Sequence, residues 1–183
     1  MADSGRAQDR STARGATPLA EAVFARTHSI AEVIEELLAA SQTSIDAALH
    51  RFNSQRLAKA LLDAHERKVR IRLLTDRSKF GESGATQKLL STCGFHVRVT
   101  HGRDGDDSKM HHKFAVLDGR LVITGSYNWT FASEERNHEN VVLLRDPKLI
   151  ETYSHEFEAL WAESDAVESA DNTDSLDSNQ RHL

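Results

Sequence analysis

Residues 113–124 read Lys-Phe-Ala-Val-Leu-Asp-Gly-Arg-Leu-Val-Ile-Thr, in which two apolar runs, 114–117 and 121–124, flank the pair Asp118-Gly119. An Asp-Gly pair between two such runs is typical of a tight β-hairpin. Both runs are apolar on nearly every side chain, so both faces of the hairpin would be covered. This stretch therefore predicts a hairpin that lies deep in a sheet.

Segments with helical and with strand periodicity alternate around this hairpin. Strands are predicted over residues 21–25, 45–52, 69–73, 95–99 and 140–144, and helices over 30–38, 55–67, 82–92 and 147–161. Ser29, Ser54 and Asp146 stand directly before three of these helices, where capping side chains are preferred. Because parallel strands need helical crossovers, this order predicts an α/β domain with a mixed, largely parallel central sheet flanked by helices.

Length and composition suit a single domain, with 183 residues of which 39% are hydrophobic. Residues 1–17 and 163–183 are polar and aperiodic, so we expect a disordered lead and an acidic disordered tail around a folded domain over 18–162. The formal net charge of −5 lies in the tail, and the domain itself sums to −1. A chain-wide basic field, the usual mark of a nucleic-acid binder, is absent.

Targeting and redox signals are also absent from the sequence. No stretch approaches the roughly 18 to 20 apolar residues of a membrane span, and the first residues lack the apolar core of a secretory signal. The single cysteine, Cys93, excludes an internal disulfide framework and a thiolate metal cluster, and is expected to be a small buried residue. We therefore expect a cytoplasmic location and no transmembrane segment.

Polar side chains gather at the open end of the predicted hairpin. A two-residue loop would place His111 opposite Ser126, and side chains two apart on one strand share a face. The residues that would then lie on one side of the sheet are His111, Lys113, Ser126 and Asn128. Lysine, serine and asparagine donate hydrogen bonds to phosphate oxygens, and an imidazole is a nucleophile or proton carrier near neutral pH.

Other polar residues near the hairpin are candidates for supporting this chemistry. A neutral imidazole nucleophile needs an acceptor at its far nitrogen, and Glu139, at the head of the last predicted strand, is a candidate. The protein itself supplies positive charge for the phosphate, so the pattern requires no metal and no cofactor. A zinc or calcium site in the loop 101–112 is an alternative, but the acidic run lacks EF-hand spacing and favours a solvated loop.

Basic residues outside the hairpin are candidates for contact with an anionic substrate. Arg103 and Lys109 flank the hairpin and would steer or bind such a substrate. Arg70 and Arg72 share one face of a predicted strand, where they would line either a phosphate groove or a solvated surface.

Residues 111–118, His-His-Lys-Phe-Ala-Val-Leu-Asp, fit the pattern H-x-K-x(4)-D. Residues 125–130 fit the downstream G-S-x-N element, and residues 137–140 fit the N-x-E-N segment after it. Together they closely resemble the phospholipase D superfamily, in particular its single-motif members, the bacterial endonuclease Nuc and the mitochondrial cardiolipin hydrolase (Zucchini-like) groups. The resemblance covers about residues 20–162 and implies a metal-independent phosphodiesterase that acts through a phosphohistidine intermediate.

The resemblance also implies a role for each matching residue. His111 would be the nucleophile or the acid that protonates the leaving oxygen, and Glu139 would hold it in place. The residues that would bind the non-bridging phosphate oxygens are Lys113, Ser126 and Asn128. Asp118 would support the site without reacting. Family members use two motifs per site and this sequence has one, so the resemblance implies a homodimer with the active site on its two-fold axis.

The substrate is left open between two classes that present the same phosphodiester. The near-neutral domain argues against tight non-specific DNA binding, and the missing anchor argues against an obligate lipid enzyme. We slightly favour nuclease-type activity on single-stranded DNA or RNA over phospholipase D-type hydrolysis of phospholipids such as cardiolipin. A non-catalytic phosphate-binding or scaffold module is the alternative from another class, and it would be expected to show an eroded motif.

Overall fold

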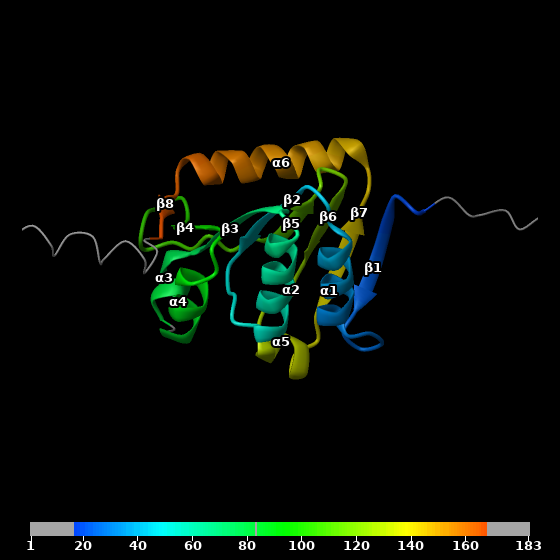
Figure 1. Ribbon diagram of the computed structural model, residues 1–183, viewed down its shortest axis with the longest axis horizontal. Helices are drawn as coiled ribbons and strands as arrows, with labels where there is room; N and C mark the ends of the chain where they lie inside the picture. Colours follow the sequence, from blue (N-terminus) through cyan, green and yellow to red (C-terminus); the bar gives the residue numbers. More distant parts are fainter. Residues whose placement is uncertain (1–16, 83, 168–183) are drawn as a thin grey trace, which may run out of the picture.

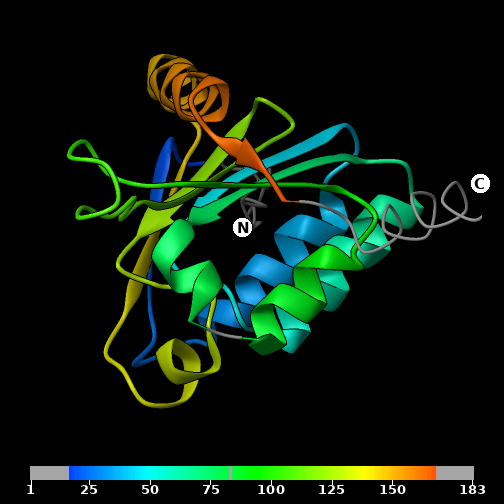
Figure 2. The ribbon, with the colours of Figure 1, turned by 90° about the vertical axis from the view of Figure 1, so that its left-hand side faces the viewer.

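A computed structural model of the chain describes residues 17–82 and 84–167. Over these residues the chain forms an eight-stranded sheet with helices on both faces (Figures 1 and 2). The predicted mixed α/β domain, with a central sheet between helices, is therefore confirmed. The disorder predicted for residues 1–16 and 168–183 lies outside the described residues.

The elements follow the predicted alternation closely. The strands are β1 Ala20–Phe24, β2 Ser44–Leu49, β3 Arg70–Asp76, β4 His96–Thr100, β5 Lys113–Leu117, β6 Leu121–Gly125, β7 Asn140–Leu144 and β8 Asp165–Ala166. The helices are α1 Ile30–Ala40, α2 Gln55–Glu66, α3 Arg77–Gly81, α4 Gly84–Ser91, α5 Phe131–Glu135 and α6 Pro147–Ala162. The sequence analysis missed α3, α5 and β8, because elements this short have too little periodicity to stand out.

Three helices begin at the side chains that the sequence analysis identified as caps. Side-chain oxygens of Ser29, Ser54 and Asp146 each accept a hydrogen bond from a backbone N–H in the first turn of α1, α2 and α6. These N–H groups have no partner within the helix, so the caps define where each helix starts.

The strand order in the sheet is β1-β7-β6-β5-β2-β3-β4-β8. Among the described strands only β2-β3 and β3-β4 are parallel neighbours, so the expectation of a largely parallel sheet is wrong. The remaining neighbours run antiparallel. Helical crossovers join neighbouring strands only from β2 to β3 and from β3 to β4, whereas β5 and β6 are joined by a hairpin and the edge strands β1 and β8 pair with strands that run the opposite way.

The β5-β6 hairpin differs from the prediction by one residue. Leu117 pairs with Leu121, which leaves residues 118–120 in the loop where two residues were predicted. The first two loop residues have positive φ, as in a type I′ turn, and the third is an extra residue that acts like a β-bulge. The extra residue shifts the pairing of the two strands by one residue, so the predicted pairing of His111 with Ser126 is wrong.

Helices cover the two faces of the sheet unequally (Figure 2). On the face of α1 and α2 lies the larger apolar core, which includes Ile34, Leu61, Leu73, Tyr127 and Trp129. A smaller apolar cluster beneath α6 includes Ala48, Leu74, Phe114 and Phe157. Cys93 is buried, as predicted. With cover on both faces, the central strands can be apolar throughout.

The sheet continues past residue 162, where the tail was expected to begin. After α6 the chain returns along β4, and β8 pairs antiparallel with it through Arg98↔Ala166 and Val99↔Asp165. This pairing covers the edge of β4 that would otherwise present open backbone groups. No helix in the described part of the chain has the length and hydropathy that a membrane crossing requires.

Candidate active site

The motif residues other than Asp118 lie at the edge of the sheet where β2 and β3 end and β5 begins. β2 runs antiparallel to β5, and just past their ladder the His50 N–H donates to the His112 carbonyl at 2.7 Å. In open α/β sheets the carboxyl ends of the parallel strands are the usual position of a ligand. The start of β5 therefore delivers His111 and Lys113 to an edge suited to binding.

His111 and Lys113 are in direct contact at this edge. The exposed imidazole of His111 has Nδ1 at 3.1 Å from Lys113 Nζ, and Nζ also donates to the His111 carbonyl oxygen at 2.7 Å. Over residues 17–82 and 84–167, no hydrogen bond engages His111 Nε2. Nε2 is thus the ring nitrogen left for another group.

The surroundings of this pair disfavour extra positive charge. Burial, then Lys113 and Lys109, lower the pKa of His111, while Asp76 opposes them. Burial also lowers the pKa of Lys113, against the attraction of Glu139. His111 is therefore mainly unprotonated at neutral pH, the form in which imidazole is a nucleophile. A partly desolvated ammonium such as Lys113 gains from a bound anion.

Ser126 is positioned by the close approach of β6 to β7. Gly125 has φ +156, and a Cβ at this position would lie 2.3 Å from the Asn140 carbonyl oxygen. Only glycine permits both the backbone conformation and the approach. The hydroxyl of Ser126 donates to the Glu139 carboxylate and accepts the Asn140 N–H at 3.1 Å.

Glu139 does not make the contact with His111 that the sequence analysis expected of an orienting residue. Its Oε1 accepts from Asn137 Nδ2 at 3.0 Å, and its Oε2 accepts from the Ser126 hydroxyl. In the described part of the chain its hydrogen bonds do not reach His111. The carboxylate instead holds Ser126 and Asn137 and favours the charged form of Lys113.

Asn128 follows on the segment after Ser126 and is partly buried. Its Oδ1 is buried and has no hydrogen-bond partner among the residues that the structure describes. An unpaired buried amide oxygen costs about 1–3 kcal/mol, so this atom calls for a further partner.

Asp118 lies at the opposite end of β5 from His111. Its carboxylate accepts the backbone N–H groups of Gln42, Thr43 and Ser44, at 2.7 to 3.1 Å, and the Thr43 hydroxyl at 2.9 Å. These bonds anchor the connection between α1 and β2. The motif aspartate is therefore built into the scaffold and is remote from the reacting group.

Arg103 and Lys109 line a cavity of about 500 Å³ that also includes His111. The loop 101–109 and α6 form its walls, and His112 contacts Glu156 of α6 through Nε2 at 3.3 Å. Most of the lining residues have polar side chains, and they carry both signs of charge. The structure thus brings the two candidate steering residues to the same cavity as the imidazole.

Sequence reasoning missed two residues of this edge, His50 and Asp76. Asp76 is 1% exposed, and its Oδ2 accepts the Met110 N–H at 2.9 Å, which fixes the backbone directly before His111. The His50 ring lies against the ring of His111, with centroids 4.2 Å apart. Both stand at or directly after the carboxyl end of a parallel strand, and that position was the available signal.

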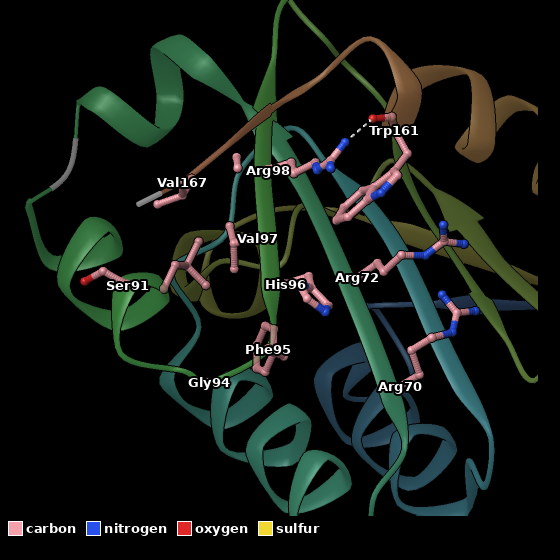
Figure 3. A pocket seen from close by; sticks show the side chains of 12 residues that line it. Arg70, Arg72, Ser91, Gly94, Phe95, His96, Val97, Arg98, Trp161 and Val167 are labelled. Carbon is pink, nitrogen blue, oxygen red and sulfur yellow. Dashed lines mark hydrogen bonds between the residues drawn. The ribbon is translucent and has the colours of Figure 1, made fainter. Parts of the chain in front are cut away.

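A larger cavity of about 760 Å³ lies between β4 and the end of α6 (Figure 3). Arg70 and Arg72 line it, but both pair with Asp46, and Arg72 also pairs with Glu158 at 2.5 Å. These acids neutralise the two guanidinium groups, so the interpretation as a phosphate groove is not favoured. His111 does not line this cavity.

The sheet, its helices and the positions of the motif residues together define a phospholipase D-like α/β domain. A family model described as "Cardiolipin synthase, PLD-like domain" matches residues 34–161. The chain therefore belongs to the phospholipase D-like family, which is a family of phosphodiesterases. The resemblance stated from the sequence motifs is confirmed.

Curated relatives belong to the same family. The chain is 40% identical over 129 residues to the mitochondrial cardiolipin hydrolase of Xenopus tropicalis, which covers 70% of this chain and 60% of that protein. It is 38% identical over 133 residues to the human mitochondrial cardiolipin hydrolase, with 73% and 51% covered. The chain thus spans little more than half the length of these relatives.

Solved structures share the fold. Nuc from Salmonella typhimurium superimposes with a TM-score of 0.73 at 24% identity, covering 82% of this chain and 98% of that one. NucT from Helicobacter pylori gives a TM-score of 0.72 at 17% identity, with 81% and 99% covered. At these identities the likeness concerns the fold alone.

The relatives correct the expected location. We expected a cytoplasmic protein, but the similar curated proteins are named as mitochondrial. The expectation rested on missing signals, and the absence of a secretory signal or membrane segment does not identify a compartment. The cytoplasmic assignment is therefore wrong.

Proposed function

We propose that this chain hydrolyses phosphodiester bonds through a covalent phosphohistidine at His111, without a metal. The observation that carries the proposal is the contact of an exposed imidazole with a partly desolvated lysine, 3.1 Å apart, at the edge where ligands bind in such sheets. Lys113, Ser126 and Asn128 bind the non-bridging oxygens, and Arg103 and Lys109 steer the anionic substrate into the adjoining cavity.

The reaction proceeds in two displacement steps. Nε2 of His111 attacks phosphorus, the bond from phosphorus to the leaving oxygen breaks, and a second imidazole gives its proton to that oxygen. Water then attacks phosphorus, its proton passes to the second imidazole, and the P–N bond breaks. The products are an alcohol, a phosphomonoester and free His111.

Lys113 must change partner before the first step. An ammonium only donates hydrogen bonds, so while it contacts Nδ1 the proton of a neutral His111 resides on Nε2. When a phosphate arrives, Nζ turns to its oxygens and releases Nδ1, which can then carry the proton. Substrate binding thereby frees the Nε2 lone pair for attack.

The second imidazole comes from another copy of the chain. The sequence holds a single H-x-K-x(4)-D pattern, and the reaction needs an acid beside the nucleophile. A two-fold homodimer that brings both copies of His111 to its axis supplies both groups.

A phospholipid of the cardiolipin type is the substrate that the relatives' names favour, and the same names support a mitochondrial location. Single-stranded nucleic acid is the second candidate, because Arg103 and Lys109 line the cavity beside His111 and can contact further phosphates of a chain. Both substrates place the same phosphodiester between the same side chains.

The test is hydrolysis of a chromogenic phosphodiester by purified protein in the presence and absence of EDTA. His111→Ala and Lys113→Ala are expected to lower kcat by about 10³-fold or more with the fold intact. His155→Ala, an exposed histidine on α6, is the matched control and keeps its activity. Full activity of His111→Ala, or complete loss with EDTA, contradicts the mechanism.

Parallel incubations with cardiolipin vesicles, single-stranded DNA and single-stranded RNA identify the substrate class. Release of phosphatidic acid that depends on His111 supports the phospholipid proposal. Cleavage of nucleic acid with no effect on vesicles supports the second candidate. A binding signal without turnover on any of the substrates indicates the non-catalytic module.

A further inference from the structure

His50 occupies an unusual position at the end of β2. Its backbone N–H continues the β2-β5 pairing, whereas its side chain is buried, with 6% of the residue exposed. Both ring nitrogens are buried without a hydrogen-bond partner in the described ranges of the chain. Since the two nitrogens make no hydrogen bond there, the ring acts on its neighbours through its flat aromatic surface.

The ring of His50 forms the wall behind His111. The two ring centroids are 4.2 Å apart, and the planes are inclined by 47°. Lys113 contacts the Nδ1 edge of His111 at 3.1 Å. The exposed imidazole is thus held on one face by a buried ring and on one edge by an ammonium, and the Nε2 edge stays open.

The charges around His50 keep its ring neutral. Burial lowers the pKa of His50 to about 4, with further lowering by the neighbouring His111 and Lys113. Asp76 at the end of β3 opposes this lowering, and Arg51 adds to it. At neutral pH the wall is therefore an uncharged aromatic ring, which does not repel His111 when that imidazole becomes protonated.

We propose that His50 is a positioning residue for the reaction at His111: its buried ring restricts the His111 imidazole to the orientation in which Nε2 faces the phosphate. An exposed imidazole samples several rotamers, whereas a ring packed in the core has only one. Nucleophilic attack needs the reacting atoms about 3–3.5 Å apart and aligned, and a misplacement of 1 Å can cost about 10²-fold in rate.

This inference rests on the proposed function, and its test compares replacements of His50 that keep or remove the flat ring. His50→Ala is expected to lower kcat on the chromogenic phosphodiester by about 10- to 100-fold while KM changes little. His50→Phe keeps the wall and is expected to retain kcat within about threefold. The control is Leu73→Ala, which opens a cavity in the neighbouring strand β3 without contacting His111.

A spectroscopic readout separates positioning from stability. The His111 ring-proton resonances should shift in His50→Ala, because the ring current of residue 50 is lost, and should stay close to wild type in His50→Phe. If His50→Ala fails to fold, His50→Leu replaces it, because leucine fills the core but lacks a flat ring. His50→Leu is then expected to lower kcat about tenfold.

The outcomes distinguish this inference from the proposed function. If His111→Ala remains active, the proposed function fails whatever His50 does. If His111→Ala is inactive but His50→Ala and His50→Leu keep wild-type kcat, only the positioning role is overturned. Equal loss of kcat in His50→Phe and His50→Ala also overturns it, because the aromatic wall would then not suffice.

Discussion

The charge on the His111 imidazole depends on its burial and on the charged side chains around it. Burial lowers its pKa first, and the ammonium groups of Lys113 and Lys109 lower it further. In the proposed homodimer one His111 attacks unprotonated while the other donates a proton. Any change of the local charge therefore moves both limbs of the pH profile together.

Lys109→Gln is expected to move the profile of kcat/KM to higher pH. The ammonium of Lys109 repels an imidazolium at His111, so its removal stabilises the protonated imidazole and raises its pKa. The measurement is kcat/KM against pH at low ionic strength, with Lys88→Gln on α4 as the matched control. A profile that stays in place or moves to lower pH speaks against this coupling.

Asp118, in contrast, is a motif residue that stabilises the fold and does not contact His111. Burial alone would raise its pKa, but the N–H groups of Ser44, Thr43 and Gln42 and the Thr43 hydroxyl hold it below the ordinary value. A carboxylate with a depressed pKa stabilises the fold above its unfolded pKa of about 3.9. That stabilisation disappears as the pH falls through the folded pKa.

Asp118→Ala is accordingly expected to lower the free energy of unfolding by about 1–3 kcal/mol at pH 7. Its kcat should stay within about threefold of wild type wherever the protein is folded, since the carboxylate lies far from His111. Urea denaturation at pH 7 and below about pH 4 measures both parts, because the difference from wild type should shrink at the lower pH. Asp118→Asn, which keeps one acceptor oxygen and tolerates positive φ, should lose less.

At the scale of elements, the end of β6 determines the position of Ser126, one of the proposed phosphate-binding residues. Because Gly125 has no side chain, β6 can approach β7 closely there. The next residue, Ser126, forms hydrogen bonds with the Glu139 carboxylate and with the backbone of Asn140. The glycine of the G-S-x-N element thus serves the geometry of the serine that follows it.

Gly125→Ala is expected to separate the ends of β6 and β7 and displace Ser126. Its Cβ would meet the Asn140 carbonyl oxygen at 2.3 Å, so we expect a loss of about 2 kcal/mol or more in unfolding free energy together with most of the activity. Gly119→Ala is the matched control, because it has positive φ but no atom within 4 Å of an added Cβ. It should cost only about 1 kcal/mol. Equal effects of the two changes would refute the close-approach argument.

At the scale of the whole molecule, the proposed mechanism requires two copies of the chain. The described part of the chain carries a single His-Lys pair, and the proposed mechanism uses two imidazoles at each phosphate, one as nucleophile and one as acid. A composite site makes activity a property of the assembly, so that a defect in one copy disables the site it shares.

Mixtures of inactive variants test this shared site. Combining His111→Ala with Lys113→Ala is expected to restore little activity, because every heterodimer still carries a defect in one motif copy. Wild-type protein exchanged with an equal amount of His111→Ala should fall to about half its activity. Activity is measured after subunit exchange, and sedimentation gives the oligomeric state. A fully active monomer would exclude the composite site.

Much of the fold was predictable because it depends on neighbours in the chain. Caps such as Ser54 and Asp146, the periodicity of each segment and the Asp-Gly turn act over a few residues, and they produced the elements where they were expected. The direction of most strands was not predictable, because it depends on which connection closes as a hairpin and which as a crossover.

The sequence by itself determined the motif residues of the candidate site, since the spacing of His111, Lys113 and Ser126 is a local pattern. Only the tertiary structure decided that Glu139 bonds to Ser126, that Asp118 serves the scaffold and that His50 backs His111. These contacts join segments far apart in the chain, and one extra residue in the hairpin loop is enough to change its register. Long-range packing, which no short window of sequence contains, therefore selected the partners of each side chain.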